Sequence, residues 1–517
     1  MKLRLPDSVI AYRDHEPIVS TPPVRCWGEE RLAVTLLPSA EPISHLRLRW
    51  DAPMREGVRV LGDAWERSYG DLEWRGIERD RKMPWYFFVS DGTDALPPSE
   101  NRLTEAFGVE TGANTMAFWQ IDPMGVTLWL DVRSGSDAYR ATQELLCATV
   151  LFMEYRGMRA YEATRRFCRL MAVNPIFPDH VVYGSNNWYY AYGESSHEQI
   201  LEDAAYIAML CEGNETTPYM VIDDGWQPNH LDAPWNCGNE RFPDMPRLAS
   251  EMRALGVRPG IWVRYLINGN EDEPRKVHDF SEECYLTEGG KVLDPSHPTV
   301  LAYVRRTTAR LVDWGYSLIK HDFSTYDILG KWGFQLDGSP VTGELHFHDR
   351  TKTTAQIIKQ FYAAIYEAAG DAVIVGCNVI GHLAVGTHHV NRIGDDTSGV
   401  EWERTRKMGV NTAGFRMGQA GAFYTADADC VGITEAVDFR LNREWMHLVS
   451  HTDSALFVSV RPGLLSPDQE CAVREALRYA SVPGRDIYPL NWMETTTPRR
   501  FFVDGAPVEY RWSLEEL

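Results

Sequence analysis

The chain contains 517 residues, of which 44% are hydrophobic and 11% aromatic, and this size predicts a globular protein of about two or three domains. Its formal net charge of −21 at pH 7 argues against a nucleic-acid or anionic-membrane partner, because the long-range field repels phosphate groups. The nine cysteines are scattered and form no CxxC pair, so neither a disulfide framework nor a zinc knuckle is indicated.

The start of the chain turns polar almost at once and has no apolar signal-peptide core. No uninterrupted apolar run approaches the roughly 18 residues that a membrane-spanning helix needs. We therefore expect a soluble protein in a reducing, cytoplasmic compartment.

The first 160 residues carry short alternating apolar patterns, separated by Gly, Pro and Asp turns. Clear examples are residues 46–50 and 125–132. Because strict alternation places every second side chain on the same face of a strand, this pattern predicts an antiparallel β-sandwich over residues 1–160. A helical pattern over residues 159–171 is the expected connection to the next domain.

Short β-rich runs then alternate with longer helical patterns, which is typical of a parallel sheet. Eight strands are expected, around residues 181–188, 219–223, 258–263, 317–322, 372–377, 391–395, 421–426 and 455–460. Helices are expected after the capping-box spacing at residues 195–198 and over residues 298–314 and 355–369. Eight such units predict a (β/α)8 TIM barrel over residues 176–461.

The last part of the chain, residues 462–517, returns to a short-strand pattern and predicts a small C-terminal β region. The expected fold class is thus multidomain α/β plus β, with the barrel between two β regions.

The active site of a (β/α)8 barrel lies at the C-terminal ends of its strands. The ends of the first six expected strands deliver, in order, Trp188, then Asp223 and Asp224, Trp262, Lys320 and Asp322, Cys377, and finally Arg392, Asp395 and Asp396. Carboxylates accept hydrogen bonds from hydroxyl groups, and an aromatic ring such as Trp226, next to the acid pair of the second strand, can cover the apolar face of a sugar. These ends predict a carbohydrate site.

Two carboxylates at opposing strand ends are what glycoside hydrolysis needs, since one attacks the anomeric carbon and the other protonates the leaving oxygen. Asp322 and the Asp395–Asp396 pair are the candidates. Lys320 is expected to hold Asp322 ionised, as a nucleophile requires, while crowding by several acids favours a proton on one member of the pair.

Six short motifs occur in an order that resembles the α-galactosidase (melibiase) family, glycoside hydrolase family 36, and its relative family 27. They are DDGW at residues 223–226, PGIW at 259–262, LDPS at 293–296, GYSLIKHDF at 315–323, VGC at 375–377 and RIGDDT at 392–397. The resemblance implies a retaining, exo-acting α-galactosidase that uses no cofactor and no metal. Its implied partner is an oligosaccharide or α-galactoside substrate, and a homo-oligomer is open.

The resemblance also implies a role for each matching residue. Asp322 corresponds to the nucleophile and Asp396 to the acid/base, because an Arg, here Arg392, stands four residues before the acid/base in the family's short bacterial members. Longer members align better on Asp395, so this choice stays open. The implied sugar-binding residues are Trp188, Asp223, Asp224, Trp262, Lys320, Cys377, Arg392 and Asp395.

The chain departs from many family members at His321 and at Arg264-Tyr265. These departures leave the sugar open, so a glycosidase or transglycosylase for another α-sugar, such as an α-N-acetylgalactosaminide or α-glucoside, is an alternative.

His346, His348 and Asp349 have a spacing that could bind metal, which keeps a metal-dependent lyase or epimerase as a second alternative. A non-catalytic carbohydrate-binding protein is a third. Asp427 and Asp429 are predicted to support a loop rather than react, and Trp65 is predicted to be buried rather than to reach over the barrel mouth.

Overall fold

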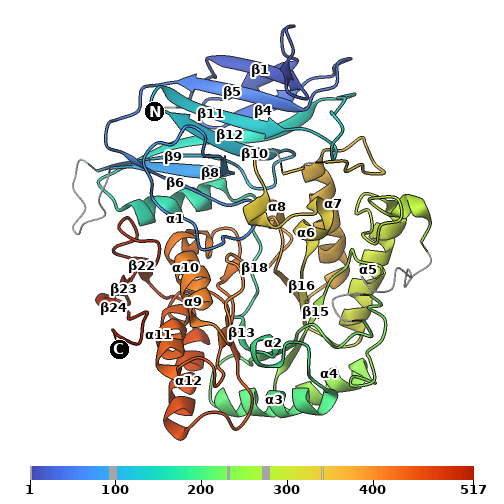
Figure 1. Ribbon diagram of the computed structural model, residues 1–517, viewed down its shortest axis with the longest axis vertical. Coiled ribbons are helices and arrows are strands. Elements are labelled where there is room, and N and C mark those ends of the chain that lie inside the picture. The colour runs from blue at the N-terminus through green and yellow to red at the C-terminus, as the bar shows by residue number, and fades with distance from the viewer. Residues whose placement is uncertain are drawn as a thin grey trace.

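The computed structural model describes residues 3–91, 102–229, 233–269, 280–338, 340–341 and 343–516. Antiparallel sheets built from the N-terminal part lie at one end of the molecule, and a parallel sheet with its helices fills the remainder (Figure 1). The C-terminal strands lie along one side of this second part, below the N-terminal sheets. The architecture is mixed α/β.

The N-terminal region forms two six-stranded antiparallel sheets. In spatial order the first contains β2 (Glu16–Pro17), β1 (Ser8–Arg13), β5 (His45–Asp51), β11 (Gly125–Asp131), β10 (Met116–Asp122) and β7 (Met83–Pro84). The second contains β3 (Val24–Trp27), β4 (Leu32–Leu36), β12 (Leu145–Arg156), β9 (Leu103–Val109), β8 (Tyr86–Ser90) and β6 (Arg59–Gly62).

The alternation seen in the sequence explains how these strands are buried. In β5, Leu46, Leu48 and Trp50 are buried, whereas Arg47 and Arg49 are half-buried. The antiparallel character expected of residues 1–160 is confirmed, and the sandwich arrangement stays a prediction.

Nine parallel strands form the central sheet. Their spatial order is β19 (Thr425–Asp427), β18 (Val390–Arg392), β17 (Val373–Gly376), β16 (Leu318–His321), β15 (Arg258–Val263), β14 (Tyr219–Ile222), β13 (Tyr183–Asn186), β21 (Leu456–Ser459) and β20 (Val431–Gly432). Eight of them are the strands expected from the sequence. β14 and β17 are fully buried apolar runs, as expected for a parallel sheet covered on both faces.

The seventh expected unit is interrupted. β19 pairs with β18, and β20 pairs with β21 at the other end of the sheet. Between them Asp429 has a φ of 75°, a left-handed conformation that a strand cannot contain. A hydrogen bond of 2.8 Å from Ala455 N to Ala426 O joins the two ends of the sheet. A regular eight-stranded barrel is therefore not what the structure shows, because its strands number nine and the seventh is broken.

Helices follow most of the strands. The longer ones are α1 (Ala160–Met171), α3 (His197–Leu210), α4 (Met245–Ala254), α5 (Pro298–Asp313), α7 (Thr354–Ala369), α11 (Phe439–Ser450) and α12 (Pro467–Ala480). The short ones are α2 (Trp188–Ala191), α6 (Ser324–Leu329), α8 (Gly381–Ala384), α9 (Trp402–Thr405) and α10 (Asn411–Phe415). The helix expected after residues 195–198 begins at His197, because the Ser196 hydroxyl accepts a hydrogen bond from Gln199 N. None of the described helices combines the length and the apolar character needed to cross a membrane.

The C-terminal region contains the expected β structure as a three-stranded antiparallel sheet of β22 (Ile487–Pro489), β23 (Arg500–Val503) and β24 (Ala506–Glu509). It also contains α12, which corrects the interpretation of residues 462–517 as β structure alone. Ser466 and Gln469 form a capping box at the start of α12, and Pro467 takes the first helical position. The helix packs against α11 and α3 and therefore belongs with the parallel sheet.

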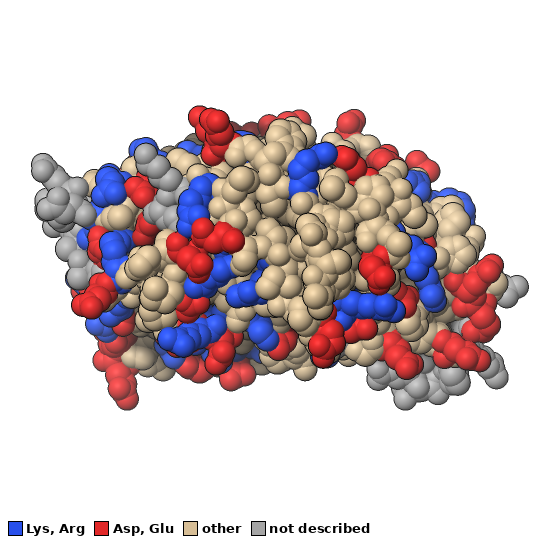
Figure 2. All heavy atoms as spheres, turned by 90° about the horizontal axis from the view of Figure 1, so that it is seen from above, with Lys and Arg blue, Asp and Glu red and all other residues tan. Residues whose placement is uncertain are grey.

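Figure 2 views the molecule from the end that carries the N-terminal sheets. Acidic and basic side chains are interspersed there around an uncharged central band. The formal charge of −21 is thus not gathered into one acidic patch on this face.

Candidate active site

The C-terminal edge of the parallel sheet brings the predicted residues of β14, β15 and β16 together. Lys320 Nζ lies 2.6 Å from Asp223 Oδ2, and Trp262 Nε1 donates a hydrogen bond of 3.1 Å to Asp322 Oδ2. Side chains alternate along a strand, so Lys320 and Asp322 share one face while His321, between them, points to the other.

Asp322 is half-buried and held by two donors. Besides Trp262 Nε1, the backbone N–H of Phe323 donates to Asp322 Oδ1 at 2.7 Å. Phe323 has a φ of 62°, and this left-handed turn at the end of β16 allows its N–H to face the preceding side chain. Lys320 donates its hydrogen bond to Asp223 rather than to Asp322, and it interacts with Asp322 through charge alone. That Lys320 holds Asp322 ionised stays a prediction.

Asp223 and Asp224 are both buried. Asn186 Nδ2 donates to Asp223 Oδ2 at 2.7 Å, and Gln227 Nε2 donates to Asp224 Oδ1 at 2.5 Å. Burial opposes the charge of Lys320, but Asp223 outweighs that effect and raises the pKa of Lys320 well above its usual value. Lys320 is therefore charged, and its ammonium group is held against Asp223.

Asp396 lies between two guanidinium groups. Arg392 Nη1 donates to its Oδ1 at 2.9 Å, and Arg67 Nη1 donates to the same oxygen at 3.1 Å. Burial would raise the pKa of Asp396, but the positive charges of Arg67, Arg392 and Lys320 outweigh burial and lower it. The Asp396 side chain nevertheless remains 41% exposed, so this carboxylate is accessible.

Asp395 differs from its neighbour because arginines occupy both of its oxygens. Arg67 Nη2 lies 3.0 Å from Oδ1, and Arg404 Nη2 donates to Oδ2 at 2.8 Å. Burial raises the pKa of Asp395, the charge of Asp396 adds to this, and Arg67 opposes it. Each oxygen of Asp395 already faces an arginine N–H donor, so neither oxygen has room for a proton of its own. Asp395 therefore suits the role of a structural anion better than that of an acid that protonates a ligand.

Arg392 is fixed by the two acids at the end of β19. Its Nη2 lies 2.5 Å from Asp429 Oδ1, and its Nε lies 3.4 Å from Asp427 Oδ2. Asp429 also accepts a hydrogen bond from Thr397 N at 2.7 Å. These contacts support the prediction that Asp427 and Asp429 hold the loop in place, and the role itself stays a prediction.

Cys377 lies between the two groups of charges. It is buried, and burial raises the pKa of its thiol well above the usual value. The charge of Asp322 raises this pKa further, while Arg392, Lys320 and Arg67 lower it. The thiol is therefore neutral and surrounded by the charged residues of β16 and β18.

The three indole rings have different surroundings. Trp188 is half-buried and makes an edge contact with Tyr192 at 5.5 Å between ring centroids. Trp262 is only 1% exposed and contributes a hydrogen bond rather than a stacking surface. Trp226 is fully buried, and its Nε1 donates to Trp262 O at 2.9 Å. The expectation that Trp226 covers a sugar ring is wrong, because its ring packs against Trp235 and Trp314 in the core.

The two departures from the family pattern, His321 and Arg264, have different surroundings. His321 is fully buried, and its Nε2 lies 2.7 Å from His388 Nε2 on the helix-facing side of β16. Arg264 pairs with Asp327 at 2.5 Å and lies over the Phe323 ring. Arg264 thus contacts Phe323, whose backbone N–H donates to Asp322.

The histidine cluster does not converge on one point. His346 Nδ1 contacts Asp137 Oδ2 at 2.9 Å, His348 packs its ring on His297, and Asp349 pairs with Lys352 at 2.8 Å. Within the described ranges, no group of three or more His, Cys, Asp or Glu side chains is arranged to hold a metal ion.

Arg67 is the residue that the sequence did not single out. It follows Trp65, which is buried as predicted and donates its Nε1–H to Asp337 O at 3.1 Å. The charged residues Asp63, Glu66 and Arg67 in one short segment were the available signal. Nothing local assigns them to a site formed by β18.

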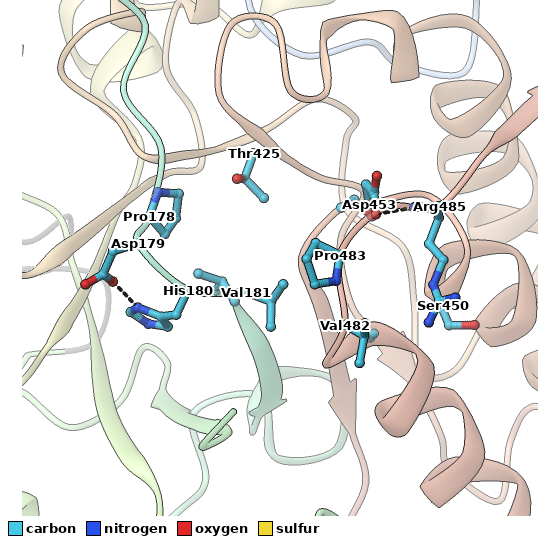
Figure 3. Close-up of a pocket in the computed structure, with 13 residues that line it drawn as sticks. Pro178, Asp179, His180, Val181, Thr425, Ser450, Asp453, Val482, Pro483 and Arg485 are labelled. Carbon is cyan, nitrogen blue, oxygen red and sulfur yellow. Dashed lines mark hydrogen bonds and ion pairs between the residues drawn. The ribbon is translucent and has the colours of Figure 1, made fainter. Parts of the chain in front are cut away.

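A separate hollow of about 310 Å³ lies elsewhere (Figure 3). Its lining includes His180 and Val181 before β13, Thr425 at the start of β19, and Asp453 before β21. These residues precede their strands, so the hollow lies at the N-terminal edge of the sheet, opposite the candidate site.

Comparison with known proteins gives a likeness in structure but none in sequence. No protein-family model matches the chain, and no curated protein matches it. The α-galactosidase TtGalA from Thermus thermophilus, solved with p-nitrophenyl α-D-galactopyranoside, matches with a TM-score of 0.61 at 15% identity over 99% of this chain and 98% of that one.

Two further structures agree with this match. A variant of the family 36 α-galactosidase AgaA from Geobacillus stearothermophilus, solved with raffinose, has a TM-score of 0.56 at 12% identity over 88% of this chain and 67% of that one. The galactosidase domain of the α-galactosidase–sucrose kinase AgaSK has a TM-score of 0.54 at 13% identity over 92% of this chain and 71% of that one. The chain therefore has the fold of solved α-galactosidases.

Proposed function

We propose that the protein is a retaining, exo-acting α-galactosidase of glycoside hydrolase family 36, which hydrolyses terminal α-galactosides. One observation carries the proposal: of the carboxylates gathered at the strand ends, Asp322 and Asp396 are the two that remain half-exposed, while Asp223, Asp224, Asp395, Asp427 and Asp429 are buried. Two accessible carboxylates around a neutral thiol and a buried lysine suit a nucleophile and an acid/base.

In this mechanism Asp322 attacks the anomeric carbon and forms a covalent glycosyl-enzyme. The hydrogen bonds from Trp262 Nε1 and Phe323 N orient its carboxylate for the attack. Asp396 protonates the leaving oxygen and then activates the water that releases the sugar. The buried network of Asp223, Asp224 and Lys320 supplies fixed polar groups for the sugar hydroxyls, with no cofactor.

The neighbours support the substrate class. The T. thermophilus enzyme was solved with an aryl α-galactoside and with stachyose, and the G. stearothermophilus variant with raffinose. Trp188, half-buried at the end of β13, is the aromatic side chain that we assign to the edge of this sugar site.

We extend the proposal to the domains. Residues 176–461 form a modified (β/α)8 barrel in which β19 and β20 are two parts of the seventh strand, and the bond between Ala455 and Ala426 supports closure. Residues 1–160 form a sandwich, supported by the 5.1 Å contact between the rings of Trp50 and Phe152 from the two sheets. Residues 462–517 form the C-terminal part. A reducing, cytoplasmic location is supported by nine cysteines that are all free.

The test is hydrolysis of an aryl α-galactoside by the wild type and by Asp322→Ala, with and without azide. We expect the variant to lose about 10³-fold or more of the rate. Azide should restore turnover and give the β-galactosyl azide, because it attacks from the face that Asp322 vacates. Asp313→Ala, which removes an exposed carboxylate at the end of α5, is the matched control and should keep the wild-type rate.

Absence of turnover by a folded wild type would refute the assignment as an α-galactosidase. A panel of other α-glycosides would then identify the sugar.

A further inference from the structure

The segment that carries Arg67 is hydrogen-bonded to the segment that carries the acid pair. Ser68 N donates to Ile393 O at 3.0 Å, and Asp395 N donates to Ser68 O at 2.8 Å. Residues after β6 of the N-terminal region thus extend the end of β18 as a parallel bridge. This connection fixes the backbone of Arg67 relative to Asp395 and Asp396.

The Arg67 side chain is fixed as firmly as its backbone. The side chain is only 6% exposed. Its Nη1 lies 3.1 Å from Asp396 Oδ1, and its Nη2 lies 3.0 Å from Asp395 Oδ1. The guanidinium also lies over the rings of Tyr69 and Trp332. A planar guanidinium with two carboxylates on its edge and rings on its faces has little freedom to turn.

The contacts divide the Asp396 carboxylate into two unlike oxygens. Oδ1 accepts from both Arg67 and Arg392, whereas Oδ2 accepts from no donor in the described part of the chain. The other charged or titratable groups that act on Asp396 are Lys320, Arg404 and Asp395, with the Tyr189 hydroxyl also near. Oδ2 is therefore the oxygen on which a proton can be carried.

We propose that Arg67 is a positioning residue for the acid/base: it anchors Asp396 Oδ1 so that Oδ2 faces the leaving oxygen, and it makes the N-terminal region part of the catalytic unit. The inference rests on the proposed function, in which Asp396 donates a proton. The same contact favours the ionised carboxylate, so Arg67 also sets the pH at which the proton is lost.

The sign follows from the charge. Removing a cation beside a carboxylate favours its protonated form, so the pKa of Asp396 should rise in a variant without the charge. The basic limb of kcat/KM against pH reports the acid in the free enzyme, and that limb should move to higher pH. The expected shift for Arg67→Met is roughly one to three pH units, as for the loss of a close opposite charge.

The experiment measures this profile with phenyl α-galactoside, whose poor leaving group needs protonation. Arg67→Lys keeps the charge and should keep the limb within about one unit of the wild type. Arg75→Met, from the same N-terminal segment but paired with Glu73, is the matched control and should leave the profile unchanged. Arg67→Gln replaces the Met variant if that variant does not fold.

A second substrate separates positioning from damage. The 2,4-dinitrophenolate released from 2,4-dinitrophenyl α-galactoside is a good leaving group that needs no proton. Loss of acid positioning should therefore lower the rate with phenyl α-galactoside at least about tenfold more than the rate with the dinitrophenyl substrate. Equal losses on both substrates, or an unmoved basic limb in the folded Met or Gln variant of an active enzyme, overturn the inference and leave the proposed function standing. A folded wild type that turns over neither substrate overturns both.

Discussion

At the scale of single residues, Trp262 shows how burial changes the meaning of an aromatic side chain. It is almost inaccessible, yet its Nε1–H is one of two donors to the Asp322 carboxylate. A hydrogen bond to a charged group contributes roughly 1.5 to 3 kcal/mol. The residue therefore acts on the reaction through Asp322 rather than by stacking on a sugar.

We expect Trp262→Phe to keep the packing and lose the donor. Since about 1.4 kcal/mol corresponds to a tenfold rate change, kcat should fall about ten- to a hundredfold, with a smaller change in KM. Steady-state kinetics on an aryl α-galactoside measure this. Trp129→Phe removes an indole N–H from an N-terminal strand, where it bonds Gln120, and should leave kcat as it is. Equal kcat values for both variants would contradict the assignment.

The site residues that lie at strand ends were predicted from the sequence, because the end of the strand determines their position. Lys320 and Asp322 lie in the site because β16 ends there. Arg392 is the last residue of β18, and Asp396 follows it by four residues. Partners across the fold escaped prediction. Arg67 and Asp396 are 329 positions apart, and contacts such as the bridge of Ser68 to the end of β18 bring them together in the fold.

At the scale of elements, α12 shows a helix fixed by its cap. Ser466 Oγ accepts from Gln469 N at 3.4 Å, and Gln469 Oε1 accepts from Ser466 N at 2.9 Å. Ser466→Ala should lower the free energy of unfolding by about 1 kcal/mol. Urea denaturation followed by circular dichroism measures it. Glu475→Ala, at an exposed position of the same helix, should stay within about 0.5 kcal/mol of the wild type, and a larger loss there than at Ser466 would refute the capping role.

The positions of the strands were predicted from the sequence, but the interruption of the seventh strand was not. The eight short β-rich runs expected from the sequence all contain strands, and those of β14 and β17 are the apolar runs that a sheet covered on both faces needs. The break between β19 and β20 was not predictable, since Asp429 takes its left-handed conformation among Arg392, Thr397 and Tyr189 from other parts of the chain. A pattern within one segment contains no information on those partners.

At the scale of the whole molecule, buried charges join the N-terminal sheets to the parallel sheet. Arg416, after α10, lies 2.8 Å from Asp63, and its Nη1 donates to Glu66 O and Ile393 O at 2.6 and 2.8 Å. One guanidinium thus holds the segment before Arg67 against the end of β18. The two parts of the molecule should therefore unfold together rather than separately.

Asp63→Ala tests this coupling, because it leaves the Arg416 guanidinium buried without its carboxylate. Breaking a buried ion pair by removing one partner costs about 3 to 5 kcal/mol. We expect a loss of that size in urea unfolding, together with reduced galactosidase activity, since the displaced segment carries Arg67. Glu367→Ala breaks the exposed Arg305–Glu367 pair of 3.0 Å and should cost no more than about 1 kcal/mol. Tryptophan fluorescence and circular dichroism should give coincident transitions in the wild type, and two separated transitions would mean that the N-terminal sheets fold independently of the site that they complete.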